Sequence, residues 1–90
     1  MIHFTLYGRG YCHLCEDMLA ALQALQVPDS AITVVDVDGD EALVAQYDEW
    51  VPVLTARRGA QAEQRLCHYF LDAEAVRAFV AGESRAARAE

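Results

Sequence analysis

Apolar and polar residues alternate at the start of the chain, which is the pattern of a strand with one buried face. The apolar side holds Ile2, Phe4 and Leu6, and the alternation ends at Gly8. From Cys12 the spacing of apolar residues lengthens to the period of a helix. The residues that would share a helical face with Cys15 are Met18, Leu19, Leu22 and Leu25. We therefore expect a strand over residues 2–7 and a helix from Cys12 to about residue 26.

The next segment predicts a second strand and a second helix. Residues 31–37 form a nearly continuous β-branched run, which is typical of a strand buried on both faces, as in a parallel sheet. With the first strand and helix, this run makes a βαβ unit. Asp38 is followed three residues later by Glu41, and this capping-box pattern predicts a helix start there.

The following segment predicts a hairpin. Residues 51–55 are expected to form a strand with Pro52 at its beginning, where the missing N–H costs least. Residues 57–59 predict a turn, and residues 65–70 predict a further strand that pairs with the preceding one.

Asp72 predicts the cap of a last helix, which ends at Gly82. The resulting order, βαβαββα, predicts an α/β fold with a four-stranded mixed sheet flanked by helices. We expect one domain over residues 1–81. Residues 82–90 hold no large apolar side chain, so we expect a flexible tail there.

The composition narrows the range of partners. The 90 residues hold 14 acidic side chains against seven arginines and no lysine, a formal charge of −7. This charge disfavours nucleic acid and anionic membranes, each of which requires a basic face. No apolar stretch reaches the roughly 18 residues of a membrane span, and the start of the chain lacks the pattern of a secretory signal. We expect a cytoplasmic monomer.

Cys12-His13-Leu14-Cys15 is the one strong chemical signal in the chain. A C-x-x-C pair at the start of a helix in a βαβ unit is typical of a redox motif. The free N–H groups and the dipole at a helix N-terminus favour a thiolate at Cys12, whereas Cys15 points into the apolar face. Cys12 would therefore attack an incoming disulfide, and Cys15 would resolve the mixed disulfide.

Two alternatives are half a zinc site and a pair of inert core thiols. Zinc needs about four ligands. The other candidate ligands in the chain are His3, His13, Cys67 and His68. Adjacent residues on a strand point to opposite faces, so Cys67 and His68 would not easily reach one ion. A metal or iron–sulfur carrier that binds through Cys12 across two chains stays open, as does a redox-inert interaction module with Trp50 and Tyr11 as its contact patch.

These motifs resemble those of the thioredoxin superfamily, and in particular of the small glutaredoxin-like proteins. The segments that carry the resemblance are Tyr7-Gly8-Arg9-Gly10-Tyr11-Cys12-His13-Leu14-Cys15, Val35-Asp36-Val37-Asp38 and Trp50-Val51-Pro52-Val53-Leu54. The resemblance covers roughly residues 1–81. It implies a thioredoxin-like fold and a thiol–disulfide oxidoreductase that reduces protein or glutathione mixed disulfides. It implies no metal or organic cofactor, with glutathione as a possible co-substrate.

The resemblance also implies roles outside the cysteine pair. Pro52 would be the family's cis-proline, and the backbone of Val51 would hydrogen-bond the substrate peptide or glutathione as a short added strand. Arg9 stands three positions before the first cysteine, where glutathione-binding glutaredoxins carry a basic residue, and it would pair with a glutathione carboxylate. Asp72 is the only match to the Gly-Gly-x-Asp stretch that holds the γ-glutamyl end of glutathione.

Three further residues each allow a functional and a structural interpretation, and a fourth is expected to be structural. His13 stands where the family that the chain resembles usually has a proline, directly after the first cysteine. It either stabilises the Cys12 thiolate when protonated or is a solvated first-turn residue. Tyr11 either shapes the cleft beside Cys12 or is a half-exposed loop aromatic. Trp50 either contacts a partner or belongs to the core. Cys67 is expected to be a small core residue.

Overall fold

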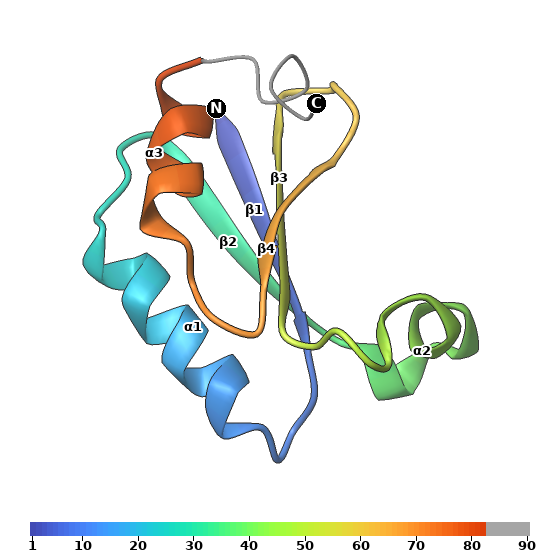
Figure 1. Cartoon of the computed structure of the whole chain (residues 1–90). Helices are drawn as coiled ribbons and strands as arrows, with labels where there is room; N and C mark the ends of the chain where they lie inside the picture. Colours follow the sequence, from blue (N-terminus) through green and yellow to red (C-terminus); the bar gives the residue numbers. More distant parts are fainter. Residues whose placement is uncertain (83–90) are drawn as a thin grey trace.

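Four strands form one mixed sheet in the order β2-β1-β3-β4 (Figure 1). They are β1 (Ile2–Gly8), β2 (Ser30–Asp36), β3 (Val53–Arg58) and β4 (Gln64–His68). β1 pairs in parallel with β2 and antiparallel with β3, which in turn pairs antiparallel with β4. This computed structural model describes residues 1–82, so residues 83–90 of the expected tail lie outside the described residues.

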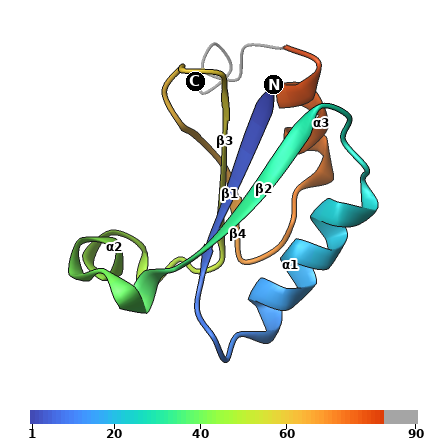
Figure 2. The same cartoon turned by 180° about the vertical axis from the view of Figure 1, so that it is seen from behind.

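Three helices flank the sheet: α1 (His13–Ala24), α2 (Glu41–Tyr47) and α3 (Ala73–Val80), with a 3-10 turn, η1 (Val37–Gly39), before α2. Helices α1 and α3 cover one face of the sheet, and α2 lies on the other side (Figures 1 and 2). The expected α/β fold with a four-stranded mixed sheet is confirmed.

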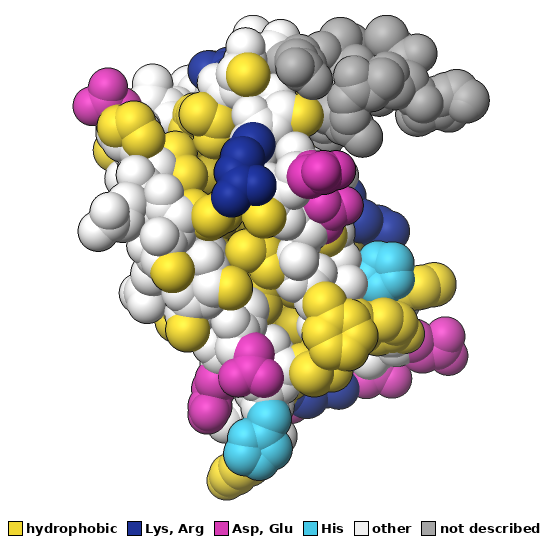
Figure 3. Space-filling model, turned by 60° about the vertical axis from the view of Figure 1, so that its left-hand side comes forward, with side chains coloured by type: hydrophobic (Ala, Val, Ile, Leu, Met, Phe, Trp, Pro, Cys, Tyr) yellow, Lys and Arg dark blue, Asp and Glu magenta, His cyan; other side chains and the backbone are white. Residues whose placement is uncertain are grey.

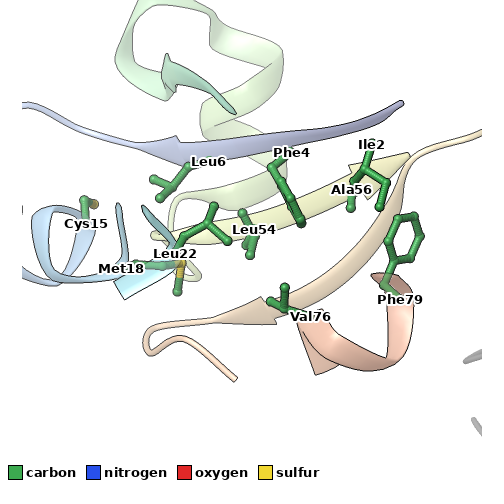
Figure 4. Close-up of a cluster of buried hydrophobic side chains, with 10 residues drawn as sticks. All are labelled: Ile2, Phe4, Leu6, Cys15, Met18, Leu22, Leu54, Ala56, Val76 and Phe79. Atoms are coloured by element: carbon green, nitrogen blue, oxygen red, sulfur yellow. The ribbon is translucent and has the colours of Figure 1, made fainter. Parts of the chain in front are cut away.

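The main core lies between the sheet and the two helices α1 and α3 (Figure 4). Its buried side chains are Ile2, Phe4, Leu6, Cys15, Met18, Leu22, Leu54, Ala56, Val76 and Phe79. The alternation in β1 and the apolar stripe of α1 both point into this core, as predicted. Each large apolar side chain buried there contributes about 1.5–3 kcal/mol relative to an exposed one. Cys15 is therefore part of the main core.

The expectation that residues 31–37 are buried on both faces is wrong. β2 lies at the edge of the sheet, with β1 as its only neighbour, and Val34 is 57% exposed. A run of β-branched residues favours a strand. It does not distinguish an edge strand from a central one.

The predicted cap of α2 is also wrong. Asp40, and not Asp38, caps this helix, because its carboxylate accepts a hydrogen bond from the Ala42 N–H at 2.8 Å. The chain first makes η1, which Asp36 caps. Asp38 lies within that turn, and its carboxylate binds Arg9 instead.

The β3–β4 hairpin is confirmed, but its limits differ from the expected ones. Arg57 and Arg58 continue β3, and the turn falls at Gly59, whose φ is +53°. β4 ends at His68, because Tyr69 adopts a left-handed φ of +66° that ends the extended backbone.

Candidate active site

Cys12 and Cys15 form a disulfide at the N-terminus of α1, with their Cα atoms 5.1 Å apart. Cys12 is the N-cap residue of the helix, and its sulfur accepts a hydrogen bond from the Cys15 N–H at 3.0 Å. Cys12 is half-buried, whereas Cys15 is only 7% exposed. The predicted difference in exposure between the two cysteines is therefore present.

Gly8, the last residue of β1, lies directly against the buried cysteine. A Cβ atom added to Gly8 would lie 2.8 Å from the Cys15 Sγ and 3.1 Å from its Cβ. Gly8 and Cys15 also line a cavity of about 240 Å³ that reaches Val34 on β2. The sequence marks Gly8 only as the end of a strand, so this close contact was not predicted.

The Val51-Pro52 peptide bond is cis, as the resemblance implies. Val53 pairs with Tyr7, so Pro52 lies level with Gly8, at the end of the sheet that also carries the two cysteines. The Val51 N–H already donates to the Tyr47 carbonyl oxygen at 3.1 Å.

Arg9 is held by two aspartates. Its Nη2 donates to the Oδ1 of Asp38 and to the Oδ1 of Asp48, each at 2.9 Å. These hydrogen bonds, that of Asp48 first, raise the pKa of the Arg9 guanidinium above its ordinary value. The side chain is 29% exposed. Its predicted role as a ligand for a glutathione carboxylate stays a prediction, and any such ligand would meet these two carboxylates.

Three other predicted binding residues, Tyr11, His13 and Asp72, are all exposed to solvent. Tyr11 is fully exposed and His13 is exposed, so neither belongs to the core. Asp72 caps α3 as predicted, and its Oδ1 accepts a hydrogen bond from the Ala75 N–H at 3.0 Å. One oxygen of this carboxylate is thus already bound.

An aromatic patch, formed by Trp50, His68, Tyr69 and Phe70, lies beside Pro52. The ring centroid of Trp50 is 5.0 Å from that of His68 and 6.3 Å from that of Tyr69. The Tyr69 N–H donates to the Pro52 carbonyl oxygen at 2.9 Å. Trp50 is 40% and Phe70 69% exposed. The sequence singled out Trp50, but the other three were missed because a continuous strand was expected there.

Cys67 is a free, half-buried cysteine that packs against the main core, as expected. Burial raises the pKa of its thiol, and the Asp72 N–H, which donates to the sulfur at 3.5 Å, opposes this in part. Its surroundings are those of a packing residue.

Within residues 1–82, no three His, Cys, Asp or Glu side chains come together as a set of metal ligands. In the same part of the chain, no helix has the length and apolarity needed to cross a membrane.

A family profile described as "Glutaredoxin-like domain (DUF836)" matches residues 3–81. Protein Ne2328 from Nitrosomonas europaea, solved by solution NMR, is 40% identical, with a TM-score of 0.75 over 87% of this chain and 89% of its own. The X-ray structure of target protein XcR50 from X. campestris is 34% identical, with a TM-score of 0.62 over 90% of this chain and 99% of its own. No curated protein matches the chain.

Thioredoxins of known structure share the fold at lower identity. Fasciola hepatica thioredoxin is 17% identical, with a TM-score of 0.66 over 92% of this chain and 81% of its own. This likeness and the four-stranded mixed sheet confirm the thioredoxin-like fold.

Proposed function

Because the chain belongs to the glutaredoxin-like family of the thioredoxin superfamily, we propose that it is a thiol–disulfide oxidoreductase that uses Cys12 and Cys15. The observation that carries this proposal is the unequal cysteine pair at the N-terminus of α1. Cys12 caps the helix and is half-buried, and Cys15 belongs to the core within disulfide distance of it.

In the reduced protein, Cys12 is the attacking group. The Cys15 N–H points at its sulfur, and the dipole of α1 favours negative charge there, so the thiolate is stabilised. The thiolate attacks one sulfur of a substrate disulfide and forms a new S–S bond with it. The substrate bond breaks, and the other substrate sulfur leaves as a thiolate that takes a proton from water.

Cys15 then gives up its proton to water and attacks the sulfur of Cys12, and the second substrate sulfur leaves as a thiolate that takes a proton from water. The substrate has gained two electrons and two protons, and the enzyme has lost the same in forming the Cys12–Cys15 disulfide. Two equivalents of a thiol, for which glutathione is one candidate, restore the dithiol by the reverse exchange. The cycle requires no metal or organic cofactor.

The substrate chain would lie along Val51 and Pro52, beside the aromatic patch. Since the Val51 N–H is bound to Tyr47, the Val51 carbonyl oxygen is the backbone group proposed to accept a hydrogen bond from the substrate. Tyr11 is exposed next to Cys12 and would contact the same segment. We propose that the protein acts as a monomer in the cytoplasm, where thiols such as Cys67 stay reduced.

Three cysteine variants test the proposal. Cys12→Ser should abolish reduction of a glutathionylated protein or a protein disulfide, and Cys15→Ser should accumulate a mixed disulfide that mass spectrometry detects. Cys67→Ala is the matched control and should keep its activity. Activity retained by Cys12→Ser would contradict the mechanism, and stoichiometric iron or zinc in anaerobically purified protein would favour a metal carrier instead.

A further inference from the structure

Arg9 is not free to bind an anion in the usual way, because two carboxylates already contact its guanidinium group. Their combined negative charge is larger than the single positive charge of Arg9. Asp38 lies in η1 and Asp48 is the C-cap residue of α2, and both carboxylates bind the same guanidinium nitrogen. One positive charge faces two negative ones, so the group formed by Arg9, Asp38 and Asp48 has a formal charge of −1. An incoming carboxylate would meet net repulsion there.

The surrounding loops add no other strong cation. β3 begins at the same end of the sheet at which β1, β2 and β4 finish. The segments that converge at this end are residues 9–12, 37–40, 48–52 and 69–72. Arg9 is the only Lys or Arg in these four segments. The acidic residues in them are Asp38, Asp40, Asp48, Glu49 and Asp72. Figure 3 shows acidic side chains at the lower end of the molecule, where α1 begins, together with a histidine and exposed hydrophobic side chains.

We infer that this site selects its disulfide by charge, with Asp38 and Asp48 as the residues that determine the specificity. Because Asp38 and Asp48 together outweigh the single charge of Arg9, glutathione disulfides, which carry carboxylates close to the sulfur, are disfavoured. Protein disulfides with neutral or basic neighbouring residues are the preferred class. This inference rests on the proposed function and names its substrate class.

A matched pair of probes tests the inference on the unmodified protein. Glutathione disulfide and its fully esterified ethyl ester share the same sulfurs and peptide backbone, and differ in whether the carboxylates are free. The rate constant for oxidation of the reduced protein by each is measured by quenched alkylation and mass spectrometry. We expect the ester to react roughly fivefold faster or more, because like charges repel at this edge. An equal or faster reaction of glutathione disulfide itself would overturn the inference.

The double variant Asp38→Asn/Asp48→Asn tests the assigned residues. It keeps the side-chain carbonyl oxygens but frees the charge of Arg9, so the ratio of the rate constants, free acid over ester, should rise about tenfold. The ratio is insensitive to changes in Cys12 reactivity, because both probes react with the same thiolate. Addition of Arg9→Ala to the double variant should reverse a large part of the gain, because the formal charge of the group then falls from +1 to 0.

Asp17→Asn/Glu41→Gln is the matched control, because it removes the same amount of charge from two exposed residues without touching Arg9. A rise in the ratio equal to that of the double variant would overturn the assignment of Asp38 and Asp48. If the double variant does not fold, the test uses the single variants Asp38→Asn and Asp48→Asn, each of which should raise the ratio, together with the comparison of the two probes on the unmodified protein. A reduced protein that reacts with neither probe contradicts the proposed function itself, whereas one that reacts and prefers free carboxylates contradicts only the selection by charge.

Discussion

Gly8 is the residue that allows the buried cysteine to sit against the end of β1. The Cys15 Sγ lies 2.8 Å from the position that a Cβ of residue 8 would occupy, which is closer than side-chain atoms pack. In Gly8→Ala the disulfide or the strand must shift, and overpacking of this kind costs about 1–3 kcal/mol. Urea unfolding of the oxidised protein should show this loss. Gly10→Ala is the control, since nothing lies within 4 Å of a Cβ there, and equal losses in the two variants would contradict the role of Gly8.

Cys67 provides a prediction about pH. Burial, the larger cause, raises the pKa of its thiol, so the folded state favours the neutral form. In a Cys12→Ser/Cys15→Ser variant, alkylation of Cys67 should therefore need a higher pH than the roughly 8.5 of a free cysteine. The stability that comes from the neutral thiol is complete below that pH and is lost as the pH rises through the pKa of the folded state. Alkylation with the profile of a free cysteine would contradict this.

At the scale of helices and strands, the sequence predicts those features that depend on residues close together in the chain. The alternation in β1, the apolar stripe of α1 and the cap of α3 at Asp72 depend on neighbours within a few residues, and all three are confirmed. The exposure of β2 depends on the order of strands, which no local pattern contains.

The same division applies to the candidate site. The C-x-x-C spacing brings Cys12 and Cys15 together within one helical turn, so the pair was predicted. The partners of Arg9 lie 29 and 39 residues further along the chain. Asp38 meets Arg9 because β1 and β2 end at the same end of the sheet, and Asp48 meets it because the chain returns to that end before β3 begins.

Asp72 has two predicted roles, as the cap of α3 and as a contact for glutathione, and two substitutions can separate them. As the N-cap of α3, it contributes about 1 kcal/mol, which Asp72→Ala should lose in thermal unfolding. Asn caps a helix as well as Asp does, so Asp72→Asn should keep most of this stability while removing the charge. If Asp72 also contacts glutathione, Asp72→Asn will change the rate constant for glutathione disulfide at nearly unchanged stability. If Asp72→Asn lost as much stability as Asp72→Ala, the stability that Asp72 contributes would not come from its role as the N-cap.

At the scale of the whole molecule, the formal charge of −7 acts on any charged substrate before contact. Electrostatic attraction or repulsion at this range changes association rates by about tenfold or more, and salt suppresses it. Because acidic loops surround the cysteines, the effect should be strongest for a probe that carries its charge beside the disulfide.

The dependence on ionic strength follows from this distribution of charge. Between about 0.01 M and about 1 M salt, the Debye length shortens from about 30 Å to about 3 Å. The rate constant for oxidation of the reduced protein by a cystine peptide flanked by arginines should therefore fall about tenfold or more over this range. The same peptide flanked by alanines is the control and should change little, while glutathione disulfide should react faster as salt rises. An arginine-flanked peptide whose rate constant is independent of salt would show that the acidic edge does not attract substrates, and would leave short-range contacts at the aromatic patch as the source of selectivity.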